Sequence, residues 1–112
     1  MTENAADTSK ASSNTTQGAC PTNVHVPPFG GKTAPDGVRI RESWHLDSSV
    51  IGHFNGNENH QFEAWSYGDR VIDIWTGLGD ERWFKPVGIN GWVASAVING
   101  EPPGNIPLQC HQ

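Results

Sequence analysis

The sequence predicts an all-β fold, a small barrel of five to six short strands with extended segments at both ends. Three observations support this prediction. The apolar positions alternate over short runs, glycine (13) and proline (8) are frequent, and five tryptophans supply a compact aromatic core. No segment shows a helical period with caps at its ends. A chain of 112 residues is long enough for at most one small domain.

Each expected strand is a short apolar or alternating run that ends at turn residues. In chain order these runs are VRIR (38–41), VIGHF (50–54), HQFEAWSY (60–67), RVIDIW (70–75), RWFKPV (82–87) and GINGWVASAVI (88–98), the last with a tight turn at Asn90-Gly91. Alternation puts Phe62 on the opposite face from Trp65, and it requires Trp83 or Phe84 to face outward. Pro86 indicates a strand end or an edge strand.

The composition divides the chain into four parts. Residues 1–19 contain no aromatic residue and are expected to form a disordered tail. Residues 20–37 are expected to be an extended lead-in anchored by Phe29, residues 38–100 the barrel, and residues 101–112 an extended C-terminal segment.

Charge and motifs argue against several functional classes. A net charge of −5 gives no basic surface for nucleic acid or an anionic membrane, and no apolar run is long enough to span a bilayer. The five histidines are dispersed, so we expect neither a metal nor another cofactor. There is no GxSxG motif, and Asp80-Glu81 are adjacent in an expected turn, so we expect no enzymatic activity.

The two cysteines, Cys20 and Cys110, flank nearly all of the sequence that is expected to fold. A disulfide between them is the simplest interpretation, and the alternative is a pair of reduced, unrelated thiols. In the chain-entropy model a closed loop of roughly 90 residues would stabilise the fold by about 4.6 kcal/mol. A disulfide persists in oxidising compartments, which favours a secreted protein.

Four segments in this order resemble bacterial SH3-like (SH3b) domains: VRIR at 38–41, SSVIGHF at 48–54, RWFKPV at 82–87 and NGWVASAVI at 90–98. The resemblance covers about 60 residues. Two segments depart from the family pattern. Residues 65–81 are longer than the usual connection and are similar to SH3-like domains of secreted actinobacterial proteins. The first loop reads ESWHLDSS where the family more often has a Gly-Pro pair.

The resemblance implies a small barrel without catalytic machinery. Family members often hold a hydrolase on the cell wall, while others are freestanding and bind proteins. We therefore expect a secreted, monomeric binding module that recognises peptide or glycan of the peptidoglycan. The alternative is a freestanding interaction or inhibitor domain with a protein partner.

The expected site is a groove under the loop Ser43–Asp47, which follows the first barrel strand. Trp44 and His45 at the loop tip are the main candidates, because an aromatic side chain there offers a large contact area at low entropic cost. The alternative for Trp44 is packing as a lid on the barrel. The remaining ligand-binding candidates are Arg41, Glu42, Tyr67, Asp73 and, by analogy with the family, Trp83 at the groove edge.

Overall fold

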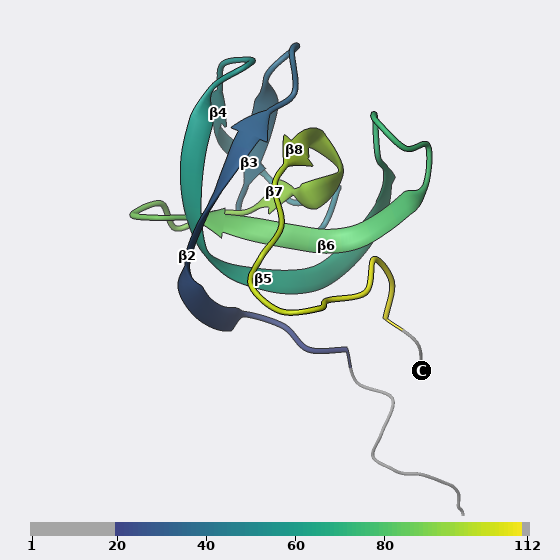
Figure 1. The fold of residues 1–112 in the computed structure, drawn as a ribbon. Helices are drawn as coiled ribbons and strands as arrows, with labels where there is room; N and C mark the ends of the chain where they lie inside the picture. The colour runs from purple at the N-terminus through teal and green to yellow at the C-terminus, as the bar shows by residue number, and fades with distance from the viewer. Residues whose placement is uncertain (1–19, 111–112) are drawn as a thin grey trace, which may run out of the picture.

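A computed structural model describes residues 20–110 and shows an all-β fold, as predicted (Figure 1). The expected tail, residues 1–19, lies outside the described residues. The strands are β2 (Val24–Thr33), β3 (Val38–Arg41), β4 (Val50–Phe54), β5 (Asn59–Ile72), β6 (Gly79–Pro86), β7 (Val93–Ala94) and β8 (Ile98–Asn99).

Five strands form one antiparallel sheet in the order β7-β6-β5-β2-β8, which curls into a nearly closed barrel (Figure 1). The expected lead-in, residues 20–37, contributes β2 to this sheet. Its Phe29 packs 5.0 Å from the Phe84 ring and 5.7 Å from the Phe62 ring, so it acts as the expected anchor. Because β2 lies between β5 and β8, the barrel needs both ends of the chain.

Strands β3 and β4 form a separate hairpin over the barrel. Two backbone hydrogen bonds join it to the larger sheet: Arg41 N–H donates to Trp92 O, and Trp92 N–H donates to Arg41 O, each at 2.8 Å. Trp92 directly precedes β7, so the hairpin lies beside one edge of the sheet. Val38 and Ile40 point from the hairpin into the core.

The buried side chains form two clusters on opposite faces of the sheet. The first fills the barrel with Phe62, Trp65, Tyr67, Phe84 and their neighbours. The second contains Ala64, Trp83, Trp92 and Ala94, with Trp44 packed against it. Trp83 and Phe84 lie in different clusters, so they face opposite sides of the sheet, as alternation predicted. Trp83 on the outer face is nevertheless buried, because Trp44 of the first loop and Trp92 before β7 pack against it.

Strand β5 departs from simple alternation at two bulges. The first lies between Phe62 and Ala64, which pair with the adjacent residues Pro86 and Lys85. The extra residue moves Trp65 to the same cluster as Phe62, so the predicted opposite orientation was wrong. The second bulge lies between Tyr67 and Val71, and the strand continues through it to Ile72. The expected strand 60–67 and the first half of the expected strand 70–75 thus form one strand, while residues 73–75 belong to the turn that follows.

The connection after β6 also differs from the expected two-residue turn at Asn90-Gly91. The chain turns at Val87-Gly88, where Gly88 has a φ of 79° that favours glycine. After β7, residues Ser95–Val97 form a short 3-10 helix. Within residues 20–110 no helix is long and apolar enough to cross a membrane.

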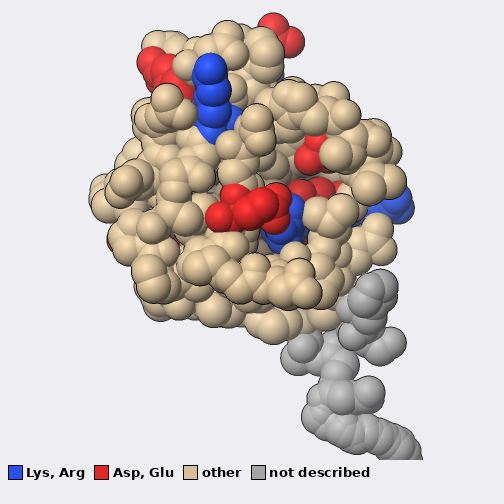
Figure 2. Space-filling view, viewed as in Figure 1, with Lys and Arg blue, Asp and Glu red and all other residues tan. Residues whose placement is uncertain are grey.

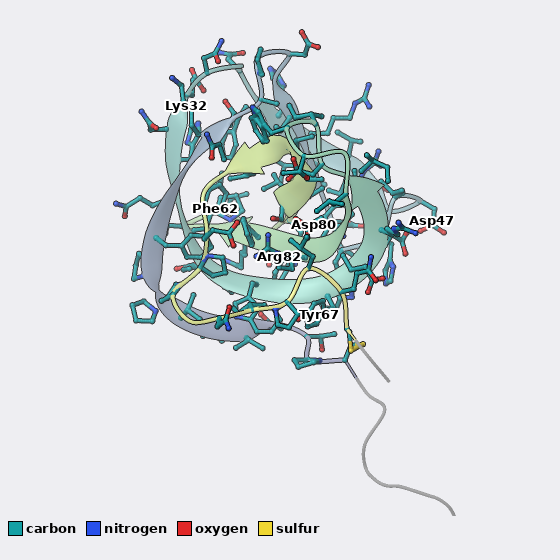
Figure 3. All side chains as sticks on the ribbon, turned by 45° about the vertical axis from the view of Figure 1, so that its right-hand side comes forward. Lys32, Asp47, Phe62, Tyr67, Asp80 and Arg82 are labelled. Carbon is teal, nitrogen blue, oxygen red and sulfur yellow. A yellow bond between two sulfur atoms is a disulfide. The ribbon has the colours of Figure 1, made fainter. Side chains whose placement is uncertain are left out.

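The predicted disulfide between Cys20 and Cys110 is present, with a Cα–Cα distance of 5.8 Å. It fastens the C-terminal segment 101–110 across one opening of the barrel. Hydrogen bonds hold the same segment: Tyr67 Oη donates to Pro107 O at 2.9 Å, and Glu81 N–H donates to Leu108 O at 2.8 Å. Figure 3 shows Tyr67 beside this segment and Arg82 inside the ring of strands.

Candidate functional site

A groove of about 510 Å³ lies between the β3–β4 hairpin, the first loop and the outer face of the barrel. It is therefore next to the loop Ser43–Asp47, where the sequence placed a site. Its lining residues come from six parts of the chain and are Asp36, Gly37, Val38, Arg39, Arg41, Leu46, His53, Phe54, Val71, Trp83, Ala94 and Val97.

The groove combines apolar lining groups with two basic residues and one acidic residue, Asp36. Leu46, Val71 and Trp83 contribute apolar surface, and β3 contributes the two guanidinium groups of Arg39 and Arg41. Arg41 Nη1 donates to Ser48 O at 2.9 Å, and neither arginine forms an ion pair with a carboxylate within residues 20–110. The groove can therefore accept a short apolar segment that carries a negative charge.

The first loop, residues 42–49, is fixed by its own hydrogen bonds and by Asp69. Ser48 Oγ donates to the carbonyl oxygens of His45 at 2.7 Å and Ser43 at 3.1 Å. Asp69 accepts a hydrogen bond from Leu46 N–H at 2.8 Å and from His45 Nδ1 at 3.2 Å. The bond from Leu46 N–H, and then that from His45, lowers the pKa of the Asp69 carboxyl below its usual value.

The second bulge of β5 explains why Asp69 reaches this loop. Between Tyr67 and Val71 the strand gains residues relative to β6, and Asp69 lies within that bulge. Its neighbour Gly68 lies against the loop, where an added Cβ would be 2.1 Å from Trp44 O. Only glycine allows this approach, so the bulge and the missing side chain together position the loop.

Trp44 packs on the barrel instead of extending from the loop tip. Its ring meets that of Trp92 edge to face, with centroids 5.0 Å apart. It does not line the groove, whereas Leu46 does and is 48% exposed. Trp44 is thus the residue that anchors the loop, which is the packing alternative considered above. A ligand contact by Trp44 stays a prediction.

The other predicted residues are dispersed. Of the seven ligand-binding candidates, Arg41 and Trp83 line the groove. Trp83 is only 1% exposed, and its indole N–H donates to Asp69 O at 2.9 Å. Asp73 instead accepts hydrogen bonds from the backbone N–H groups of Trp75 and Thr76 in the β5–β6 turn. Glu42 is exposed and lies outside the groove lining.

Tyr67 lies in the barrel core and not at the groove. Its hydroxyl donates a hydrogen bond to Pro107 O. Burial raises the pKa of that hydroxyl above its usual value. The tyrosine therefore holds the C-terminal segment. A direct role in binding would require that segment to move.

Three titratable groove residues, Asp36, Arg39 and His53, were absent from the sequence-based set. Arg39 and His53 are directly opposite each other in the β3–β4 register. The alternation in VRIR already put Arg39 on the same face as Arg41, so this signal could have found Arg39. No comparable signal exists for His53, because its pairing depends on the register of two strands separated by a loop.

Among residues 20–110, no three His, Cys, Asp or Glu side chains gather where they could hold a metal ion. Comparisons with protein-family models, with curated proteins and with solved structures give no match to this chain. The structure therefore shows a small all-β, nearly closed barrel of five antiparallel strands, and no comparison identifies the chain as an SH3b domain.

Proposed function

We propose that this chain is a non-enzymatic, secreted binding module that recognises a cell-wall peptide in the groove beside the first loop. The family resemblance supplies the cell-wall context. We choose a peptide because the groove is apolar and contains two arginines that have no carboxylate partner within residues 20–110. The peptides of peptidoglycan are short and carry free carboxylates, which guanidinium groups bind well.

A glycan fits the groove less well than a peptide. Trp83 contributes to the lining but exposes only 1% of its surface, so it offers little aromatic face for stacking on a sugar ring. Leu46 and Val71 are better matched to aliphatic side chains of a peptide. The fixed loop also favours binding, since less conformational entropy is lost when a preorganised site takes its ligand.

The disulfide fits the proposed location. Disulfides are stable in oxidising compartments and rare in the reducing cytosol. Export to the cell surface or the medium is the more specific part of the proposal, and it rests on the cell-wall role.

Sedimentation with purified peptidoglycan tests the proposal. Wild-type protein should be retained, and Arg39→Gln should weaken retention roughly tenfold, the loss expected for one hydrogen bond to a charged group. Lys32→Gln is the matched control, because it removes one exposed positive charge from a strand without altering the groove. Wild-type protein that stays in the supernatant, or equal loss from both variants, would contradict peptide recognition in this groove.

The alternative, a protein partner, is favoured by a different surface. The β5–β6 hairpin tip exposes four large apolar side chains, Ile72, Ile74, Trp75 and Leu78. Such a patch is typical of protein interaction sites. Under this alternative the Trp75→Ser variant would fail to capture a partner from the native source, and the Arg39→Gln variant would still capture it. The groove proposal expects the reverse, a loss of binding with Arg39→Gln and none with Trp75→Ser.

A further inference from the structure

A buried ion-pair cluster lies inside the barrel, apart from the groove. Arg82 on β6 is 2% exposed. Asp80 accepts hydrogen bonds from its Nε and Nη2 atoms, each at 3.1 Å, and also from Ser95 Oγ at 2.9 Å. Figure 3 shows Asp80 and Arg82 within the ring of strands. Asp80 thus neutralises Arg82 from the inner side.

The second edge of the Arg82 guanidinium donates hydrogen bonds to the Glu101 carboxylate. Nη1 donates to Oε1 at 2.6 Å and Nη2 donates to Oε2 at 3.2 Å, and Nη1 also donates to Ile106 O at a longer 3.4 Å. The Glu101 side chain is 71% exposed although its partner is almost completely buried. The carboxylate therefore reaches Arg82 from solvent. Figure 2 shows acidic and basic side chains in contact near the hollowed centre of this face.

Glu101 can leave this position without loss of the C-terminal segment. It follows β8 and Gly100 in irregular structure, while the later part of the segment has other attachments. Those attachments are the hydrogen bonds to Pro107 O and Leu108 O and the disulfide at Cys110. Rotation of the Glu101 side chain would free the two N–H groups that it occupies, while Asp80 would still neutralise the buried charge and Ile106 O would stay beside Nη1.

We propose that the outer edge of Arg82 is a second binding site, specific for carboxylates, which Glu101 occupies as an internal ligand. A guanidinium edge with two parallel N–H groups matches a carboxylate in shape and charge. An incoming carboxylate replaces Glu101 oxygen for oxygen, with no change in the number of hydrogen bonds. This site is separate from the groove, so the proposal does not depend on the proposed function.

Glu101 competes with an external ligand because it is attached to the same chain. A short tether gives an effective concentration in the millimolar range or above, so a free carboxylate binds weakly while Glu101 is present. Removing the Glu101 carboxylate should therefore reveal the site. Formate and acetate are suitable probes, since they carry the carboxylate and almost nothing else.

The experiment compares the full chain with Glu101→Ala by NMR during titration with formate and with acetate. We expect saturable shifts of the Arg82 Nε–H signal in the variant, with affinity at least tenfold tighter than in wild type, and a parallel rise in melting temperature. Glu63→Ala is the matched control, because it removes a carboxylate from the less buried ion pair with Lys85 and opens no edge of a buried guanidinium. Chloride at equal ionic strength controls for screening.

If Glu101→Ala does not fold, Glu101→Gln keeps the side-chain volume and serves in its place. Two further probes separate the possible sources of a carboxylate. N-acetylalanine presents a chain terminus, and N-acetylaspartate α-amide presents an acidic side chain. Binding of either supports the site and identifies the source. A folded variant that shows no saturable shift with any of the four carboxylates, or the same response from Glu63→Ala, would overturn the proposal.

Discussion

Replacing Trp44 with alanine should destabilise the fold and not only the loop that carries this residue. Trp44 contacts Trp92 edge to face and covers the second core cluster. Full burial of a tryptophan removes about 150–250 Å² from water. At about 25 cal/mol per Å² a partly buried tryptophan contributes roughly 2–4 kcal/mol, and the aromatic pair adds about 1 kcal/mol. We therefore expect a loss of at least about 3 kcal/mol in the free energy of unfolding.

Urea denaturation followed by circular dichroism measures this loss directly. For a domain of this size about 3 kcal/mol corresponds to a fall of roughly 10–20 °C in melting temperature. Trp75→Ala is the matched control, since Trp75 is 47% exposed at the hairpin tip and should lose less than about 1 kcal/mol.

The outcome discriminates between the two roles considered for Trp44. Equal stability losses from Trp44→Ala and Trp75→Ala would refute the packing argument. A large loss of stability with unchanged retention on peptidoglycan per folded molecule would refute a direct binding role for Trp44. A double-mutant cycle with Trp92→Ala would then isolate the pair energy.

Two further predictions follow from the other attachments of the chain. Reduction of the disulfide should lower the free energy of unfolding by about 4–5 kcal/mol while the barrel stays folded, which urea midpoints with and without reductant would measure; equal midpoints would contradict it. Because the pKa of the Asp69 carboxyl is lowered in the fold, its hold on the first loop should persist above about pH 4, the unfolded-state pKa, and weaken as the pH falls through the folded-state pKa. Hydrogen-exchange protection of the Leu46 amide should follow this course in wild type and be low at every pH in Asp69→Asn, and equal protection in the two proteins at neutral pH would exclude the mechanism.

The sequence predicted those parts of the fold that depend on local pattern. Strands β3 and β4 lie where VRIR and VIGHF placed them, and the cysteines at the two ends pair as expected. Alternation failed where β5 has bulges, because an extra residue changes which face every later side chain occupies. Nothing local in HQFEAWSY marks the position of such a residue.

The site was also predicted only in part, because a sequence pattern indicates local structure but not contacts between distant segments. The sequence placed a groove next to the first loop, and Arg41 and Trp83 lie in its lining. The orientation of Trp44 depends on its contact with Trp92, 48 positions later in the sequence. Likewise, the pairing of Arg82 with Glu101 joins a barrel strand to a segment without regular structure. Such contacts are set by tertiary packing, which a single sequence does not encode in any short window.

The disulfide between the two ends of the described chain also determines how the domain responds to mechanical force. A pull applied through the segments before Cys20 and after Cys110 passes from one sulfur to the other, across a Cα–Cα distance of 5.8 Å. The chain between the two cysteines, whose sequence separation is 90, carries no load while the bond is intact. After reduction the same pull would act on the strands and release roughly 300 Å of extended chain. While the disulfide is intact, such a pull therefore leaves the barrel strands without load.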